Sequence, residues 1–175
     1  GLNSETEIKI LEVMKDLQEN HPITISTTYM GAHAIPYEFN EDHELSDNWK
    51  KLQNQYGVGP NYAIVHAGSG KSAPNLSLDQ YRFLIEKLLR KNKWQVLLTG
   101  STAEAGINQH FMEKIPGDKI VNISGKLSLV QLMECIRNAR LLITSSTGPL
   151  HLADAQNTPV LGFFCPLPPH TPVRW

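Results

Sequence analysis

From residue 61 onward the chain alternates short apolar runs with segments of helical spacing. The apolar runs, which are typical of buried strands, lie at 62–66, 94–99, 120–123, 140–144 and 160–164. The amphipathic segments lie at 78–91, 103–114, 127–138 and 149–156. Because strands and helices alternate with short connections, we expect an α/β fold, a Rossmann-like parallel sheet with helices on both faces.

The chain begins with a different pattern. Residues 5–19 have helical spacing, with Ser4 as a plausible N-cap and Glu7 completing a capping box. Residues 23–30 are rich in β-branched side chains and predict a strand. These features predict a helix followed by a strand ahead of the regular part of the chain.

The segment between these two parts is less informative. Residues 31–47 are polar and have no clear period, and residues 48–56 predict a short helix. We therefore divide the chain into an N-terminal helix–strand appendage, residues 1–45, and a regular domain, residues 46–175.

Composition narrows the classes of function. The chain carries 16 Lys and Arg against 17 Asp and Glu, and this net charge of −1 gives no support to nucleic-acid binding. No apolar run reaches the roughly 18 residues of a membrane span, and no signal peptide opens the sequence. Cys135 and Cys165 are too few for a disulfide framework, so a reducing, cytoplasmic compartment is the default.

Ligands of open parallel sheets bind at the carboxyl ends of strands, where loops meet helix N-termini. The first such loop reads Ala67-Gly68-Ser69-Gly70-Lys71-Ser72. Glycine lets the backbone approach a ligand, hydroxyl and N–H groups can face an anion, and Lys71 adds a positive charge. The loop is not a P-loop, because Val65 stands where that motif needs glycine. A flexible turn without a ligand is the alternative interpretation.

The loop after 94–99 contains a carboxylate at the start of a helix. Glu104 either compensates the helix dipole, as acidic residues in the first turn often do, or accepts hydrogen bonds from ribose hydroxyls. The residue alone does not decide between these two roles.

The loop after 140–144 has the most specific pattern. It reads Ser145-Ser146-Thr147-Gly148-Pro149-Leu150-His151. Hydroxyls line the turn and Pro149 opens a helix, so free N–H groups and the positive end of that helix would face a diphosphate. His151, one turn into the helix, would donate to a phosphate oxygen, although a lone helical His is more often packed or solvated.

Four ordered segments carry a family pattern. They read HAGSGKSAPNLSLDQY at 66–81, VLLTGSTAE at 96–104, NISGKLSLVQLMECI at 122–136 and STGPLHLADAQNTPVLGFFCPLPPHTPVRW at 146–175. The last one resembles a (D/S)-(S/T)-G-x-x-H-x-A-A-A motif. Together, over residues 45–175, they are similar to the C-terminal domain of glycosyltransferase family 9, the lipopolysaccharide ADP-heptose heptosyltransferases.

This resemblance implies the second domain of a two-domain enzyme, which binds a nucleotide sugar here and the acceptor in the first domain. It implies as donor-binding residues Gly68, Ser69, Gly70, Lys71, Ser72, Glu104, Ser146, Thr147, Gly148 and His151. It also implies an ADP-sugar donor, a lipopolysaccharide-type acceptor, inverting transfer without metal or cofactor, and peripheral contact with the inner face of the cytoplasmic membrane. Because the catalytic base would belong to the missing first domain, we expect this chain alone to be catalytically incomplete.

The sequence departs from the family pattern at three places. Many members carry Asp where Ser146 stands, and Asp154 replaces a small residue of the A-A-A run. A usual Lys-x-Trp-Pro element is replaced by Pro74-Asn75-Leu76-Ser77, so Lys71 would have to supply the phosphate-binding charge from a different position.

Residues 1–40 resemble another family. The stretch PITISTTYMGAHAIPYEF, with its GAHA-x-P element at 31–36, is similar to imidazolonepropionase, a metal-dependent amidohydrolase. The resemblance implies that His33 occupies a substrate-contacting position, but the metal-binding residues of that family have no counterpart here. Alternatively, GAHA is a plain loop after a strand. The two resemblances meet between Glu38 and Trp49, and with a start other than Met and an end at Trp175 they favour a joined or mis-assembled reading frame.

Three functions therefore stay open. The first is the donor-binding domain of a glycosyltransferase, the second a non-catalytic α/β nucleotide-binding module, and the third an imidazolonepropionase-type amidohydrolase fragment. The four ordered motifs favour the first.

Overall fold

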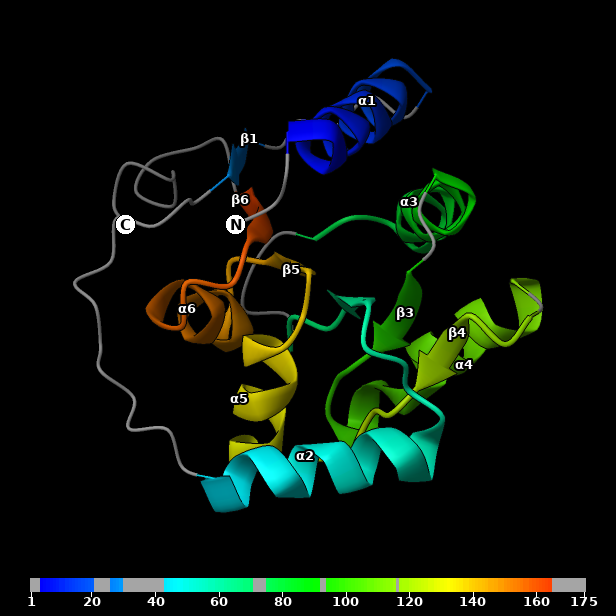
Figure 1. Cartoon of the computed structure of the whole chain (residues 1–175). Helices are drawn as coiled ribbons and strands as arrows, with labels where there is room; N and C mark the ends of the chain where they lie inside the picture. The colour runs from blue at the N-terminus through cyan, green and yellow to red at the C-terminus, as the bar shows by residue number, and fades with distance from the viewer. Residues whose placement is uncertain are drawn as a thin grey trace.

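The computed structural model describes residues 4–20, 26–29, 43–70, 75–91, 94–115 and 117–164 (Figure 1). The helices are α1 (Ser4–Asn20), α2 (His43–Tyr56), α3 (Leu78–Lys91), the 3-10 helix η1 (Thr102–Glu104), α4 (Ala105–Lys114), α5 (Leu129–Arg137) and α6 (Gly148–Ala155). The strands are β1 (Ser26–Tyr29), β2 (Tyr62–His66), β3 (Gln95–Leu98), β4 (Ile120–Asn122), β5 (Leu141–Ser145) and β6 (Val160–Phe164).

The strands form one six-stranded sheet in the order β1-β6-β5-β2-β3-β4. The five strands from β2 to β6 are parallel, and β1 adds to the edge by pairing antiparallel with β6. The chain moves outward from β2 to β4 and then returns to β5, which pairs with the other side of β2. The order of the parallel strands therefore reverses between β2 and β5, where ligands of such sheets bind.

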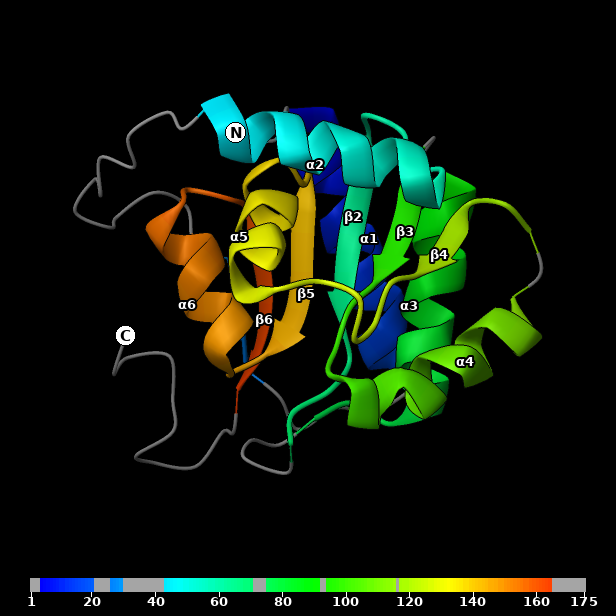
Figure 2. The same ribbon diagram turned by 90° about the horizontal axis from the view of Figure 1, so that it is seen from below.

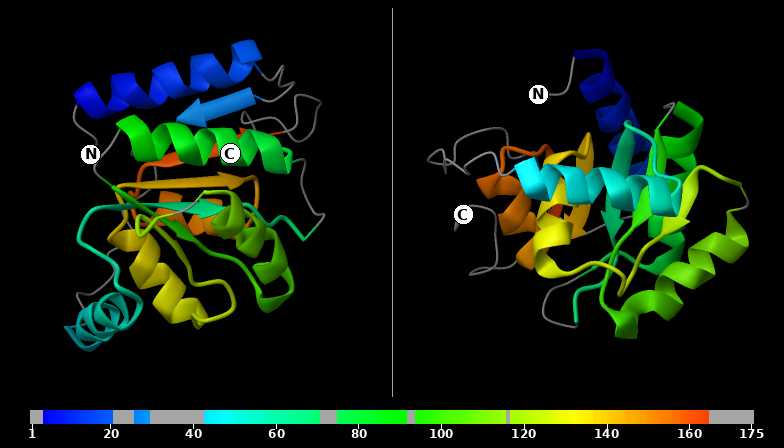
Figure 3. Two further views of the ribbon diagram at one scale, coloured as in Figure 1. Left: turned by 90° about the vertical axis from the view of Figure 1, so that its right-hand side faces the viewer. Right: turned by 60° about the horizontal axis from the view of Figure 1, so that its bottom comes forward.

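Helices cover both faces of the sheet, as the sequence predicts (Figure 2; Figure 3, left). On one face, side chains of α1, α3 and α4 pack with strand residues such as Val65 and Ile143. On the other face, α2, α5 and α6 pack with Ile64 and Leu142. Neighbouring residues of one strand point to opposite faces. Because helices cover both faces, the buried strands are apolar throughout rather than alternating between apolar and polar residues.

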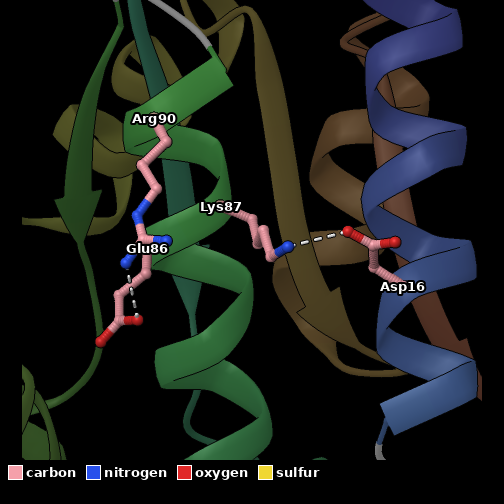
Figure 4. Close-up of polar contacts among 4 residues, drawn as sticks. All are labelled: Asp16, Glu86, Lys87 and Arg90. Atoms are coloured by element: carbon pink, nitrogen blue, oxygen red, sulfur yellow. Dashed lines mark hydrogen bonds and ion pairs between the residues drawn. The ribbon is translucent and has the colours of Figure 1, made fainter.

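The N-terminal helix and strand are part of this arrangement. α1 lies beside α3, with Val13 and Met14 buried and an ion pair of 2.8 Å between Asp16 and Lys87 (Figure 4). β1 extends the sheet, so the predicted appendage packs against the regular part of the fold. The boundary between residues 45 and 46 stays a prediction, and α2 runs across it.

Some predicted element bounds were wrong. α2 begins at His43, five residues before the predicted short helix. The spacing of Leu45, Trp49, Leu52 and Tyr56 is helical, but the polar residues between them hid the first turn. The helix predicted at 103–114 begins as η1, and the one predicted at 127–138 begins after Ser128, whose hydroxyl accepts from the Gln131 N–H as an N-cap.

Candidate functional site

A cavity of about 290 Å³ opens at the carboxyl ends of the parallel strands. Its polar lining consists of His66 at the end of β2, Thr99 directly after β3, Ser101 directly before η1, and Glu104 of η1. Its apolar lining comes from the loop after β4, from α5 and from the start of α6, and consists of Ile123, Leu127, Leu132 and Pro149. The cavity thus lies at the edge where the strand order reverses, with one polar and one apolar side.

Three polar side chains lie at or directly beside the carboxyl ends of β2, β3 and β5, and two of them, His66 and Thr99, line this cavity. Because strand residues alternate between faces, His66, Thr99 and Thr144 lie on the same face as the buried Ile64, Leu97 and Leu142. His66 pairs with Thr144 in the register of β2 and β5, and its Nδ1 lies 3.0 Å from the Thr99 hydroxyl. The apolar strands therefore end in a polar row on the α5 and α6 face of the sheet.

The Glu104 carboxylate connects two of the loops at this edge. One of its oxygens accepts from the Ser101 N–H at 2.8 Å and from the Ser101 hydroxyl at 2.9 Å. The carboxylate also lies against Gly68, and the Gly70 N–H in the same loop after β2 is near enough to lower its pKa. A Cβ at Gly68 would overlap this carboxylate, which explains the glycine. Glu104 is thus a cap of η1 and a cavity residue at the same time.

The protonation of Glu104 follows from these contacts. Burial raises the pKa of the carboxyl, but the hydrogen bonds from Ser101, the nearby His66 and the Gly70 N–H outweigh burial and hold it below the ordinary 4.5. The group is therefore a carboxylate at neutral pH, as the recognition of ribose hydroxyls requires.

His66 is the functional candidate that the sequence analysis missed. Burial lowers its pKa below the ordinary 6.5, and the neighbouring Glu104 opposes part of that shift. The ring is therefore mostly neutral at neutral pH. Its place in the sequence could have identified it as a candidate, because His66 ends an apolar strand directly before the glycine-rich loop.

The turn before α6 leads into a helix near Pro149, as the sequence predicts, but Gly148 rather than Pro149 is the first residue of that helix. Thr147 is the N-cap, with extended backbone angles of φ −134° and ψ 178°, and its side chain makes no capping bond to the helix. Its hydroxyl instead contacts the Thr144 hydroxyl at 3.3 Å and donates to the Ser145 carbonyl. No side chain therefore caps the first turn of α6, but Pro149 has no N–H and the Leu150 N–H donates to the Thr147 carbonyl at 3.0 Å, so the Gly148 N–H is the first-turn donor that remains for an anion.

The glycine-rich loop after β2 is held at its base and turns sharply at its end. Asn75 donates to the Ala67 carbonyl and accepts from the Tyr81 hydroxyl of α3. Gly70 has φ +54°, in the left-handed region that favours glycine. These contacts bring the described part of the loop, up to Gly70, against Glu104.

The predicted donor-binding residues fall into three groups. Gly68, Ser69 and Gly70 lie beside Glu104, which lines the cavity. Ser146, Thr147 and Gly148 form the turn directly before Pro149, whereas His151 is exposed on α6 and is not among the residues that line the cavity. Lys71, Ser72 and His33 lie outside the described residues.

Asn108 of α4 connects the end of β3 to the loop after β4, which forms one side of the cavity. Its Nδ2 donates to the Thr99 carbonyl at 3.0 Å and to the Ser124 hydroxyl at 2.5 Å. Its Oδ1 is buried and has no hydrogen-bond partner among the described residues. Asn108 thus joins the end of β3 to the loop that presents Ile123, and so connects the polar and apolar sides.

Known proteins are similar to this chain in sequence. A Haemophilus influenzae protein provisionally named a glycosyltransferase is 34% identical over 142 residues, which cover 80% of this chain and 41% of that protein. The chain therefore spans about two fifths of that relative's length. An imidazolonepropionase of Alteromonas mediterranea is 57% identical over 42 residues, 24% of this chain and 10% of that enzyme, so the second resemblance holds for a short segment.

Solved structures agree on the fold. A family 9 glycosyltransferase of Veillonella parvula superimposes with a TM-score of 0.60 at 18% identity, covering 67% of this chain and 34% of that one. The ADP-heptose LPS heptosyltransferase II of E. coli gives 0.59 at 19% identity, covering 68% and 37%. The family model of glycosyltransferase family 9 (heptosyltransferase) matches residues 10–175. By this match over most of its length, the chain belongs to glycosyltransferase family 9, the heptosyltransferase family.

Proposed function

We propose that the cavity at the carboxyl edge of the sheet binds the nucleoside diphosphate part of a nucleotide sugar, the donor of a glycosyl transfer. One observation carries this proposal: the Glu104 carboxylate and the uncapped start of α6 border the same cavity, at the point where the strand order reverses. A carboxylate suits ribose hydroxyls, and a helix N-terminus suits a diphosphate.

The two sides of the cavity suggest how the nucleotide lies. Ile123, Leu127 and Leu132 offer an apolar surface for a planar base. Glu104 then faces the ribose, and the turn containing Ser146, Thr147 and Gly148 faces the diphosphate. Adenine is the proposed base, because the E. coli heptosyltransferase II with the same fold is named for ADP-heptose.

The chemistry proposed for the whole enzyme is inverting, metal-independent transfer to a lipopolysaccharide-type acceptor. Charge develops on the departing diphosphate during such a transfer, and the Gly148 N–H together with the positive end of the α6 dipole would stabilise it. A further domain would bind the acceptor and supply the catalytic base, at the cytoplasmic face of the membrane. Among the described residues, no helix is long and apolar enough to cross a membrane.

The direct test is a calorimetric titration of the chain with ADP, followed by a matched variant. We expect saturable binding at or below about millimolar ligand. Glu104→Gln preserves the shape of the side chain but removes the charge, so it should weaken ADP binding about 10-fold while leaving inorganic pyrophosphate binding nearly unchanged. A folded sample that binds no ADP at millimolar concentration contradicts the proposal.

A second assay separates a transferase domain from a nucleotide-binding module without catalysis. Thr147→Val should weaken ADP binding by the chain and, in the full-length protein, also slow transfer from an ADP-sugar. Loss of nucleotide affinity without any transfer by the full-length protein would favour the binding module.

A further inference from the structure

The imidazole of His66 is held by one of its two nitrogens. Nδ1 lies 3.0 Å from the Thr99 hydroxyl, which is buried at the end of β3. The hydrogen bond with Thr99 fixes the ring relative to the sheet, so Nε2 is left as the nitrogen for a ligand in the cavity that His66 lines.

The position of His66 places it between the two ends of the proposed nucleotide site. It pairs with Thr144 in the register of β2 and β5, and the Thr144 hydroxyl contacts the Thr147 hydroxyl of the turn before α6. Glu104 lies near enough on the other side to interact with the ring electrostatically. A diphosphate at the start of α6 would therefore come close to the imidazole.

The side chains that line the cavity together with His66 are mostly uncharged. Thr99, directly after β3, contacts the ring, while Pro149 lines the cavity from α6 and Leu132 does so from α5. Ile123 and Leu127 line the cavity from the loop after β4. Among the described residues that line the cavity, Glu104 is the other titratable group, and it is ionised at neutral pH.

We propose that His66 contacts the diphosphate of the bound nucleotide and takes up one proton from solvent as the nucleotide binds. This inference rests on the proposed function. In the free protein the ring is mostly neutral, because burial disfavours the imidazolium. The negative charges of a diphosphate favour the imidazolium, so the proton moves from solvent onto a ring nitrogen and no bond within the nucleotide changes.

The affinity should therefore depend on pH in a defined direction. The ligand raises the pKa of His66, so binding strengthens as pH falls from the pKa of the complex to that of the free protein, and then levels off. Glu104 stays ionised throughout this range, because its pKa is lowered below 4.5.

The test is calorimetric titration with ADP-ribose, whose diphosphate is doubly esterified and does not itself titrate near neutral pH. Titrations in two buffers of different ionisation enthalpy give the number of protons taken up. We expect uptake of a fraction of a proton per ligand at neutral pH by the wild-type chain. His110→Gln, on α4 and away from the cavity, should leave this uptake unchanged.

Two variants make the assignment specific. His66→Gln should abolish the proton uptake and weaken ADP-ribose binding about 10-fold. Thr99→Val removes the partner of Nδ1 with little change of shape, so it should weaken binding but retain the uptake. If His66→Gln does not fold, the carbon-bound proton signals of His66 in the wild-type chain give its pKa directly, and that pKa should rise on adding ADP-ribose.

The outcomes separate this inference from the proposed function. If the wild-type chain does not bind ADP-ribose, the proposed function fails and the inference fails with it. If ADP-ribose binds without proton uptake, or if the uptake persists in His66→Gln, the role of His66 is wrong while nucleotide binding stands.

Discussion

The amino ends and the carboxyl ends of the parallel strands, called here the amino edge and the carboxyl edge of the sheet, carry similar kinds of polar side chain. These side chains have different roles at the two edges. At the amino edge, Gln95 accepts from the Gly59 N–H and donates to the Gly57 carbonyl, and Arg140 donates to Asn61 at 3.0 Å. These side chains bridge one connecting segment to the next. At the carboxyl edge, His66 and Glu104 also bond to their neighbours, but they line a cavity as well.

The direction of the chain explains this difference. In a parallel sheet every helix that follows a strand begins at the carboxyl edge, so the N–H ends and positive dipoles of α3, η1, α5 and α6 collect there. The amino edge collects carbonyl ends instead. Polar residues at a sheet edge therefore do not identify a site by type alone. The backbone groups beside them decide which edge can hold an anion.

The largest expected effect contrasts two buried hydrogen-bonding residues, one at each edge. Asn108→Ala removes donors to the Thr99 carbonyl and to Ser124 and should lower the free energy of unfolding by about 3 kcal/mol. Thr158→Val, at the amino edge, removes one donor to the Ile136 carbonyl and should cost about 1 kcal/mol. Urea denaturation measures both.

The affinity for ADP provides a second comparison of the same two variants. Asn108→Ala should also weaken ADP binding, because Asn108 joins the two sides of the cavity, whereas Thr158→Val should not. Equal ADP affinity in both variants would show that the two edges do not differ in the proposed way.

The next-largest expected effect is on ADP affinity and contrasts two glycine substitutions, one at each edge. A Cβ at Gly68 would overlap the Glu104 carboxylate, so Gly68→Ala should displace Glu104 and weaken ADP binding about 10-fold. At the amino edge, a Cβ at Gly59 would lie 3.3 Å from the end of the flexible Gln95 side chain, so Gly59→Ala should leave the affinity unchanged. Titration of both variants with ADP decides, and similar losses would contradict the contrast.

The effect of pH on the free energy of unfolding should be smaller than the effects of these substitutions. His66 at the carboxyl edge should cause part of it. The pKa of His66 is lowered in the folded chain, so the unfolded chain binds more protons below pH 6.5. The contribution of His66 to stability is thus present above pH 6.5 and is lost as pH falls toward the folded pKa. Unfolding in urea at about pH 7.5 and about pH 5.5 should show a smaller loss for His66→Gln than for wild type.

The smallest expected effect lies on a face of the sheet, away from both edges. Asp16 of α1 and Lys87 of α3 form a partly exposed ion pair of 2.8 Å (Figure 4). A double-mutant cycle with Asp16→Asn and Lys87→Met should give a coupling of about 0.5 kcal/mol that decreases with salt. ADP affinity should stay unchanged, which provides the baseline for the edge variants. A coupling of zero would mean that this contact does not fix α1 on α3.

The sequence predicted the part of the fold that follows from local pattern. Apolar runs such as 62–66 and 160–164 are buried strands because their side chains pack on both faces of the sheet. It could not predict that β1 pairs antiparallel with β6, because pairing of distant segments leaves no periodic signal. The start of α2 at His43 was hidden by charged and polar residues within an amphipathic pattern.

The candidate site was predictable to a similar extent. Gly68, Glu104 and Thr147 were recognisable because each follows a strand in a loop of characteristic composition. The contact between His66 and Thr99 was not, since two polar residues at strand ends become neighbours only through the register of β2 and β3. Likewise, the sequence offered Glu104 as either a cap or a ribose ligand, and its geometry allows both.

The attachment of Glu104 to two loops has a consequence for the thermodynamics of binding. Because its carboxylate bonds to Ser101 and lies against Gly68, the loop after β3 and the described start of the loop after β2 are already in contact before a ligand binds. Residues 68–70 and 101–104 should then lose little conformational entropy on the proposed nucleotide binding, since their contact already forms during folding. Incoming hydroxyls must instead compete with the protein's own donors for one carboxylate. Nucleotide binding at this edge should therefore be an exchange of hydrogen bonds within a preformed frame.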